Sequence, residues 1–470
     1  MILANFTDVQ QGCQTLRKRL RRKQLCLCLS RIMLKTKLAL CLLVAKKYKW
    51  LTDSYVLDFY VDNHWSKLPA SWRQVLEQLP IEKLSELLQS QTNVSIVWPL
   101  ELLALRQLLR TLCIGRLANI AQDELLPGCP VLEHVKLKHM FRKCVKPKKW
   151  HEITKMSAIC AQSCKQLNVD YVVDFGAGVG HLARVLGFGY GINVCCLEMQ
   201  AHLNAQAVTI DAKLECVAAK HLQGDDLANL RRPVHLTQRL SSTTQPAELM
   251  ESIRAAFKLP NCNFKFGIIG LHPCGDLAPT LMRLFLNCPQ AKFLHFASCC
   301  YQKMSNQGYP LSSSFELSYE AREIACHAAE QYEQRLSAGE YEYLKIHSFR
   351  AAAESIIAQH LPQLRHSALR NVKHAPGMSF HNYFERAIEG TALAELSGIL
   401  YPAQIEKDLQ YWQRIVCFYS LRLMLAPLVE SVVLLDRALF LEQDGCHVRI
   451  EAIFDPLISP RNHITSALKC

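Results

Sequence analysis

The stretch VVDFGAGVGHLARVL, residues 172–186, determines the fold expected for this chain. Its apolar start predicts a buried strand that ends at Asp174, and the residues from His181 onward predict a helix. Three glycines alternate between them, and glycine permits the tight turn that places main-chain N–H groups at a helix start. This strand–loop–helix unit therefore predicts a site where a nucleotide-like ligand lies against the backbone.

The segments around this loop alternate between strand and helix patterns. Strands are expected over 169–176, 192–199, 233–238, 264–272 and 292–301, and helices over 149–167, 202–222, 247–259 and 277–287. Strands that alternate with helices in this way form a parallel sheet with helices on both faces. We therefore expect an α/β fold with a Rossmann-like sheet.

A carboxylate at a fixed spacing from the glycines narrows the choice of ligand. Glu198 lies 20 residues after Gly178, at the end of the second expected strand, where it can accept hydrogen bonds from both ribose hydroxyls of an adenosine. Gly176, Gly178 and Gly180 follow a GxGxG spacing instead of the GxGxxG of dinucleotide-binding proteins. With Asp174 ahead of them, they favour S-adenosylmethionine as the cofactor. A nicotinamide or flavin cofactor and a plain tight turn are the alternatives.

The motif LHPCGDLAPT, residues 271–280, follows a later strand and is expected at the same edge of the sheet. His272 is the candidate general base, because the unperturbed pKa of histidine lies near neutrality. Asp276 is the second candidate catalytic residue on the acceptor side, and Cys274 is expected to line the substrate pocket. The alternative is that the motif only forms a turn, with His272 as a hydrogen-bonded scaffold residue.

Two further cysteines end the following strand in ASCCY, residues 297–301. Cys299 and Cys300 are expected to shape the floor of the substrate pocket. Beside His272 and Cys274 they are also the residue types of a thiolate-rich metal site. Free cysteine is, however, a common small core residue, so we expect no metal.

The net charge of +13 is distributed unevenly along the chain. Residues 1–50 contain 12 Lys and Arg against a single acid, Asp8, so most of the excess lies in this arm. The arm is open to three interpretations: a poorly ordered extension, a basic amphipathic helix on a membrane surface, or an organelle-targeting segment. A second basic stretch, Lys136 to Lys155, either meets a phosphate backbone near the pocket or is an exposed helix face.

The spacing of the cysteines and the length of the apolar runs bear on the cellular location of the protein. The 21 cysteines have no regular spacing and no cleavable secretory signal precedes them, which favours reduced thiols in the cytosol or nucleus. The basic N-terminus leaves a mitochondrial location open. No run of 18 apolar residues occurs, so we expect no transmembrane helix.

Four consecutive segments are expected from these patterns. They are a basic arm over 1–50, for which disorder is one of the three interpretations, a helical region over 51–130, the α/β core over 131–310, and a mainly helical region over 311–470. A late strand over 448–455 in the last segment is expected to complete the sheet from the C-terminal end.

Several motifs resemble a known family when they are taken together and in order. They are LTDSYVLDFYVDNHW, KPKKWHEI, VVDFGAGVGHLARVL, GLHPCGDLAPTLMRLF, the CCY of SCCYQKMS, GYPLSS, APLVESVVLLDRALFL and FDPLISPRN. The chain from about residue 51 to 463 resembles the methyltransferase-like protein 25 family, which includes the ribosomal RNA adenine dimethylase domain-containing proteins. GLHPCGDL with the later CCY is also similar, locally, to a family of tRNA ribose 2′-O-methyltransferases. The resemblance implies a class I methyltransferase fold that binds S-adenosylmethionine through the loop from Asp174 to Gly180 and through Glu198.

The sequence speaks against adenine dimethylation. Enzymes that methylate the adenine amino group resemble one another in a strand-end motif, Asn/Asp-Pro-Pro-aromatic or Asn-Leu-Pro-aromatic, which holds the exocyclic nitrogen of an unstacked base. This chain has His272-Pro273-Cys274-Gly275 at the corresponding place. Our leading hypothesis is a methyltransferase with an RNA acceptor. A protein methyltransferase and a cofactor-binding scaffold without catalysis are the alternatives.

Overall fold

The computed structural model describes residues 31–89, 95–118, 130–241, 243–366, 369–373 and 376–469. The chain divides into two compact units, each built from segments that are distant in sequence. Unit 1 consists of Met1–Leu40, Gly115–Glu316 and Ser431–Cys470, and unit 2 of Cys41–Ile114 and Leu317–Glu430.

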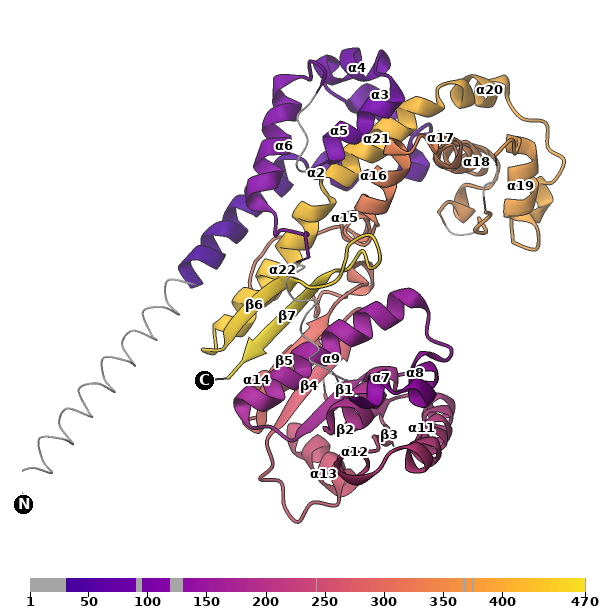
Figure 1. Ribbon diagram of the computed structural model, residues 1–470. Coiled ribbons are helices and arrows are strands. Elements are labelled where there is room, and N and C mark those ends of the chain that lie inside the picture. The colour runs from indigo at the N-terminus through magenta and orange to yellow at the C-terminus, as the bar shows by residue number, and fades with distance from the viewer. Residues whose placement is uncertain are drawn as a thin grey trace, which may run out of the picture. The chain divides into compact units, whose positions relative to one another are not determined.

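Unit 1 is built on one seven-stranded sheet. Its strands are β1 (Tyr171–Phe175), β2 (Asn193–Glu198), β3 (Val234–Thr237), β4 (Phe266–Leu271), β5 (Ala291–Ala297), β6 (His447–Ala452) and β7 (His463–Leu468). The order across the sheet is β3-β2-β1-β4-β5-β7-β6, as Figure 1 shows. Strands β1 to β5 run parallel to one another, and β7 is antiparallel to both β5 and β6. The expected α/β, Rossmann-like sheet is confirmed.

Helices cover both faces of this sheet. In unit 1 they are α7 (Pro130–Glu133), α8 (Val135–Arg142), α9 (Pro147–Leu167), α10 (His181–Arg184), the π-helical turn η4 (Val185–Gly189), α11 (Ala201–His221), α12 (Gly224–Ala228), α13 (Pro246–Phe257), α14 (Leu277–Asn287), the 3₁₀ turn η5 (Tyr301–Lys303) and most of α22 (Ala426–Glu442). Because successive side chains of a strand point to opposite faces, Val172 and Val173 of β1 belong to two different hydrophobic clusters.

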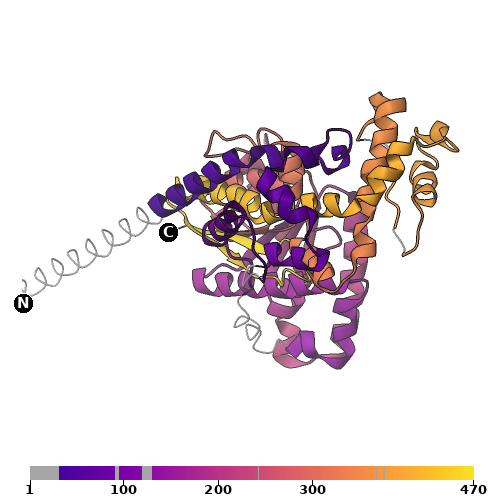
Figure 2. The ribbon, with the colours of Figure 1, turned by 90° about the horizontal axis from the view of Figure 1, so that it is seen from above.

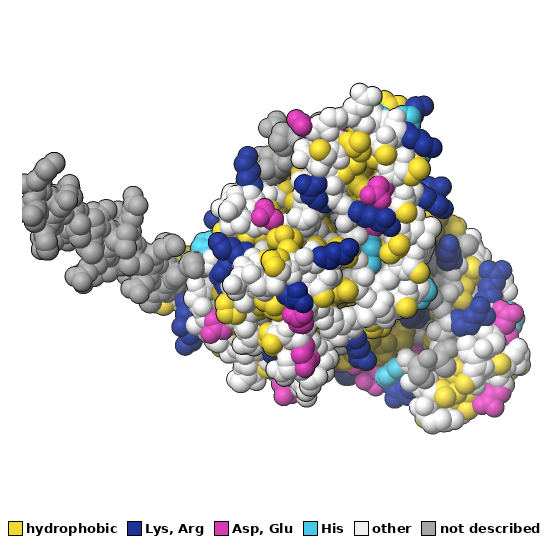
Figure 3. Space-filling model, turned by 90° about the horizontal axis from the view of Figure 1, so that it is seen from below, with side chains coloured by type: hydrophobic (Ala, Val, Ile, Leu, Met, Phe, Trp, Pro, Cys, Tyr) yellow, Lys and Arg dark blue, Asp and Glu magenta, His cyan; other side chains and the backbone are white. Residues whose placement is uncertain are grey.

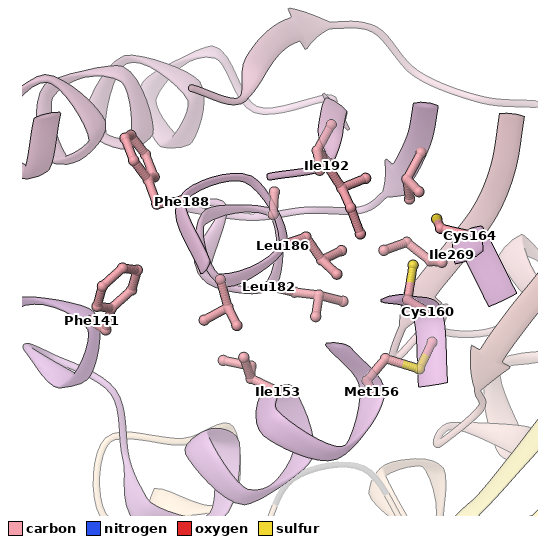
Figure 4. Close-up of a cluster of buried hydrophobic side chains, with 14 of the residues drawn as sticks. Phe141, Ile153, Met156, Cys160, Cys164, Leu182, Leu186, Phe188, Ile192 and Ile269 are labelled. Carbon is pink, nitrogen blue, oxygen red and sulfur yellow. The ribbon is translucent and has the colours of Figure 1, made fainter. Parts of the chain in front are cut away.

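The two clusters define the helical layers. One joins Val172 to α8, α9, α10 and α11, and the other joins Val173 to α13 and α14. Figure 4 shows Ile153 and Met156 of α9 pointing toward Leu182 and Leu186, which follow the glycine loop. Full burial of a side chain of this size contributes about 1.5–3 kcal/mol. The apolar face of α9 therefore fixes the helix that leaves the loop.

The structure differs from the expected elements at three places. The late strand expected over 448–455 is a pair, β6 and β7, because the chain turns back after β6 and fills the edge beside β5. Strand β5 ends at Ala297, so the two following cysteines lie beyond the strand and not within it. The helix expected after the glycine loop is a four-residue α-helix followed by a π-helical turn.

Unit 2 is helical. Its elements are α2 (Lys49–Thr52), η1 (Val56–Asp58), α3 (His64–Lys67), α4 (Ala70–Glu77), η2 (Ile81–Leu84), α5 (Ser85–Leu88), α6 (Leu100–Leu112), α15 (Tyr319–Ile324), α16 (Ala329–Ser337), α17 (Tyr341–Leu344), α18 (Ile346–His360), η6 (Pro362–Leu364), α19 (Phe380–Ile388), η7 (Ala394–Leu396), α20 (Ala403–Gln410) and α21 (Trp412–Met424). Helices α18, α19 and α20 gather around one hydrophobic cluster (Figures 1 and 2). Trp65, Trp72 and Trp98 are buried and belong to the core of the described residues.

The division into units departs from the consecutive segments expected from the sequence. Residues of the 51–130 and 311–470 segments form unit 2 together, because their helices bury apolar faces against one another, whereas 431–470 supplies strands to the core sheet. Residues 31–47 of the expected basic arm are helical, and residues 1–30 lie outside the described residues. Among the helices that the structure describes, none has the length and apolarity needed to cross a bilayer.

Candidate functional site

The glycine loop connects β1 to α10 at the carboxyl edge of the sheet. The three loop glycines have positive φ angles, which residues other than glycine rarely adopt: 71° at Gly176, 58° at Gly178 and 72° at Gly180. The N–H of Gly176 donates to the Leu197 carbonyl at 2.9 Å, which ties the loop to β2. A Cβ built on Gly178 meets nothing within 4 Å, so this residue borders open space that a ligand can fill.

Glu198 at the end of β2 faces this loop as expected. Its Oε2 accepts a hydrogen bond from the Gly178 N–H at 3.0 Å, and its Oε1 accepts one from the Gln200 N–H at 3.0 Å. The residue is 8% exposed. A carboxylate oxygen has further lone pairs, so Glu198 fixed in this way can still accept hydrogen bonds from a diol. The arrangement fits the ribose of an adenosine.

Asp174 ends β1 beneath the loop and is 3% exposed. Burial raises the pKa of its carboxyl to about 7, an effect that Glu198 strengthens and the Lys149 cation opposes. A buried acid of this kind gains from a positive charge placed beside it. The site at the loop therefore has two acids: Glu198, which can accept hydrogen bonds from ribose hydroxyls, and Asp174, which can interact with a positively charged group.

A buried network that the sequence did not predict holds the loop from behind. Arg184 of α10 donates from Nη2 to the Val179 carbonyl at 2.9 Å and from Nε to Asp211 Oδ1 at 2.6 Å. His235 of β3 donates from Nε2 to Asp211 Oδ2 at 2.7 Å. The side chains of Arg184 and Asp211 are 2% and 0% exposed. A Cβ on Gly180 would lie 3.1 Å from the His235 ring, so a side chain there would press on the network in addition to straining the backbone at its positive φ of 72°.

His272 lies at the end of β4 with a φ of 69°, an unusual backbone conformation for a residue with a side chain. Its N–H donates to the Ala297 carbonyl at 3.1 Å, and its Nε2 lies 2.8 Å from Glu152 Oε2. Glu152 Oε1 accepts a hydrogen bond from the Ser459 hydroxyl at 2.5 Å. The result is a histidine held by a buried carboxylate, with Nδ1 left to act as a base.

Glu152 is the anionic member of this group. Burial on its own raises the pKa of its carboxyl, but the hydrogen bonds from His272 and Ser459 and the nearby Lys148 cation outweigh it, so the net shift is downward. An ionised Glu152 therefore accepts the Nε2–H of His272 and stabilises the ring when it gains a proton.

The structure brings together two motifs that lie about 300 residues apart. His151 and Glu152 belong to the start of α9, within KPKKWHEI, and Ser459 belongs to the loop FDPLISPRN. The Asp455 N–H donates to His151 Nε2 at 2.9 Å, beside the Ser459–Glu152 bond. The signal that was present was the joint occurrence of both motifs in the family resemblance.

Asp276 takes a different place from the one expected. Its Oδ1 accepts a hydrogen bond from the Ser305 N–H at 2.8 Å, and a Cβ on Gly308 would lie 2.1 Å from the same oxygen. This carboxylate fastens the turn after β4 to the loop after β5. The catalytic role expected for Asp276 stays a prediction, and its observed contacts are those of a positioning residue.

The three expected pocket cysteines converge. The Sγ atoms of Cys274, Cys299 and Cys300 lie 3.3 Å from one another in every pair. Cys274 is exposed, Cys299 is buried and Cys300 is half-buried. Gly275 permits this approach, because a Cβ on it would lie 2.8 Å from the Lys303 carbonyl oxygen.

The sheet order, the glycine loop after its first strand and the acid at the end of its second strand define a class I methyltransferase domain. Residues 148–307 match the model of a family described as a methyltransferase domain. The chain is 28% identical over 225 residues to the probable methyltransferase-like protein 25 of Mus musculus. The matched region covers 43% of this chain and 37% of the relative. The protein of the same name from Homo sapiens is 27% identical over 224 residues, covering 43% and 36%.

These matches confirm the resemblance predicted from the motifs: the chain contains a methyltransferase domain, and it is similar over 43% of its length to methyltransferase-like protein 25. The match spans little more than a third of the length of these curated relatives.

Proposed function

We propose that unit 1 is an S-adenosylmethionine-dependent methyltransferase whose acceptor is RNA. The observation on which this rests is the pairing of Glu198 with the Gly178 N–H at 3.0 Å, beside open space at Gly178. When bound, S-adenosylmethionine supplies a methyl group activated by a positive sulfonium. Glu198 would accept the ribose hydroxyls, and Asp174 would face the cationic part of the cofactor.

His272 would act on the acceptor. With its Nε2–H directed at Glu152, the unprotonated Nδ1 is able to take the proton that the acceptor atom loses as it is methylated. Ser459 holds the other oxygen of Glu152, so the carboxylate cannot rotate away. Methyl transfer needs alignment above all, and a fixed histidine contributes to that alignment as well as to proton removal.

The basic stretch ahead of β1 supports RNA as the acceptor. Its cationic side chains are exposed along α8 and the start of α9: Lys136, Lys138, Arg142, Lys143, Lys146, Lys148 and Lys149. Lys148 Nζ lies 3.8 Å from Glu152 Oε1, so the stretch ends beside the His272–Glu152 pair. On the face shown in Figure 3, Lys and Arg side chains are spread among acidic and hydrophobic ones. The position of the stretch next to the candidate base therefore supports an RNA acceptor, because phosphate contacts there would hold an RNA.

Transfer of a labelled methyl group tests the acceptor class. The full-length protein and labelled S-adenosylmethionine are incubated with total RNA or with total protein from the same cells. We expect label in RNA, and none with Gly178→Arg, whose side chain would fill the open space beside the loop. Label found only in the protein fraction, dependent on Gly178, would contradict the RNA acceptor and support a protein methyltransferase.

A further inference from the structure

The cluster of Cys274, Cys299 and Cys300 has the geometry of a metal site. Its three Sγ atoms form a triangle with edges of 3.3 Å, far above the roughly 2.05 Å of a disulfide bond. The atoms come from two turns, one after β4 and one after β5, at the carboxyl edge of the sheet. We propose that these three cysteines bind one Zn²⁺ ion whose fourth coordination position is open to solvent.

The triangle is slightly smaller than a tetrahedral zinc site requires. Zn–S bonds of about 2.3 Å at tetrahedral angles place the sulfur atoms about 3.8 Å apart, so the edges of 3.3 Å must open by about 0.5 Å when the ion binds. The centre of the present triangle lies about 1.9 Å from each corner, which is shorter than the Zn–S bond. An ion at bonding distance therefore lies to one side of the sulfur plane, and its remaining position points away from the three thiols. Iron–sulfur clusters usually need four cysteines, and the described residues place three here.

Binding of zinc by this cluster releases protons. Zn²⁺ binds cysteine as the thiolate, so any proton on the three sulfur atoms is displaced when the ion binds.

The surroundings compensate the charge of the loaded site. Three thiolates and one Zn²⁺ have a net charge of −1, and the Arg437 guanidinium of α22 is 1% exposed nearby. Arg437 donates to Ser298 Oγ at 2.5 Å and to Met304 Sδ at 3.1 Å, residues that flank the cysteine pair. Its Nε has no hydrogen-bond partner within the described ranges.

A second cluster of possible ligands in the described residues is a weaker candidate. Asp58, Glu354 and His366 of unit 2 also converge. There Arg365 Nη2 lies 2.7 Å from Asp58 Oδ1 and His366 Nε2 lies 2.8 Å from the same atom. The Asp58 carboxylate is thus already paired with Arg365. In the cysteine cluster no cation contacts the sulfur atoms in the described contacts, and Cys274 is exposed.

Cobalt is the probe that tests this site. The reduced, metal-free, full-length protein is titrated with CoCl₂ and then with ZnCl₂ under anaerobic conditions. We expect near-ultraviolet sulfur-to-cobalt charge-transfer bands that saturate at one equivalent and disappear when Zn²⁺ displaces Co²⁺. The combined variant C274S/C299S/C300S should lose these bands. The matched variant C144S/C216S/C262S, which changes three other cysteines of unit 1, should keep them.

Three results would overturn the proposal. They are no metal binding by the folded wild-type protein, bands that persist in C274S/C299S/C300S, and loss of two cluster thiols to a disulfide with no metal bound. Circular dichroism checks folding of both variants, and the single variant Cys274→Ser serves if the combined one does not fold. Because no methyl donor is present, this outcome is independent of the proposed transferase activity.

Discussion

His272→Ala should lower kcat for methyl transfer by about 10²- to 10⁴-fold, the range that a positioned general base contributes. The affinity for S-adenosylmethionine should stay unchanged, because the ring contacts Glu152 and not the glycine loop. Single-turnover transfer of a labelled methyl group measures the loss of rate, and cofactor binding measured in parallel shows whether the affinity is unchanged. His221, exposed at the end of α11, provides the control His221→Ala, which should transfer at the wild-type rate.

Glu152→Gln separates a base held by its partner from a histidine that only shapes the turn. The neutral amide cannot stabilise the positive charge that the His272 ring gains when Nδ1 takes a proton, so the base is weakened even if the hydrogen bond to Nε2 is kept. We expect a fall in kcat that approaches that of His272→Ala, with the fold intact. Wild-type kcat in both variants would contradict the role of this pair.

Asp211→Ala should destabilise unit 1 by about 3–5 kcal/mol, because it leaves the Arg184 guanidinium buried without its carboxylate. The same change removes the partner of His235 and loosens the Arg184 contact with the Val179 carbonyl in the glycine loop. Affinity for S-adenosylmethionine should therefore fall as well. Urea unfolding followed by circular dichroism measures the first effect, and calorimetric titration at a temperature where the variant is folded measures the second.

Glu215→Ala is the matched control for this change. Glu215 lies one helical turn further along α11 and also pairs with an arginine, Arg232, at 3.1 Å, but both side chains are exposed, 50% and 39%. An exposed ion pair contributes about 0–1 kcal/mol. Equal losses of stability in the two variants would show that the buried network does not hold the loop as described.

Local patterns in the sequence were sufficient to predict the strands and helices around the glycine loop. The glycine spacing, Asp174 and Glu198 predicted which strands end at the site, and α14 was predicted with its observed bounds, 277–287. These features succeed because a buried strand and an amphipathic helix are each encoded within one short segment. The convergence of the three cysteines also followed, since adjacent parallel strands end at one edge.

What sequence reasoning missed depends on contacts between distant segments. Glu152 meets His272 across 120 residues and Ser459 across 307. Asp211 likewise meets Arg184 and His235 on two other elements. The hydrogen-bond partner of a buried polar group can come from any segment that the fold brings close, so the local periodicity of the sequence does not predict it. The same limit explains the division into units, in which helices on either side of the core in sequence pack together.

Calorimetric titration of S-adenosylmethionine into the full-length protein tests the central claim most directly. We expect saturable binding at one site per chain, and none with Gly178→Arg, whose side chain would fill the open space at residue 178. This variant should lose about 1–2 kcal/mol of stability, because residue 178 has a positive φ of 58°, but circular dichroism should show that it still folds. Glu198→Gln, which keeps the shape but removes the charge, should bind more weakly. Folded wild-type protein that shows no binding, or Gly178→Arg that binds as the wild type does, would contradict it.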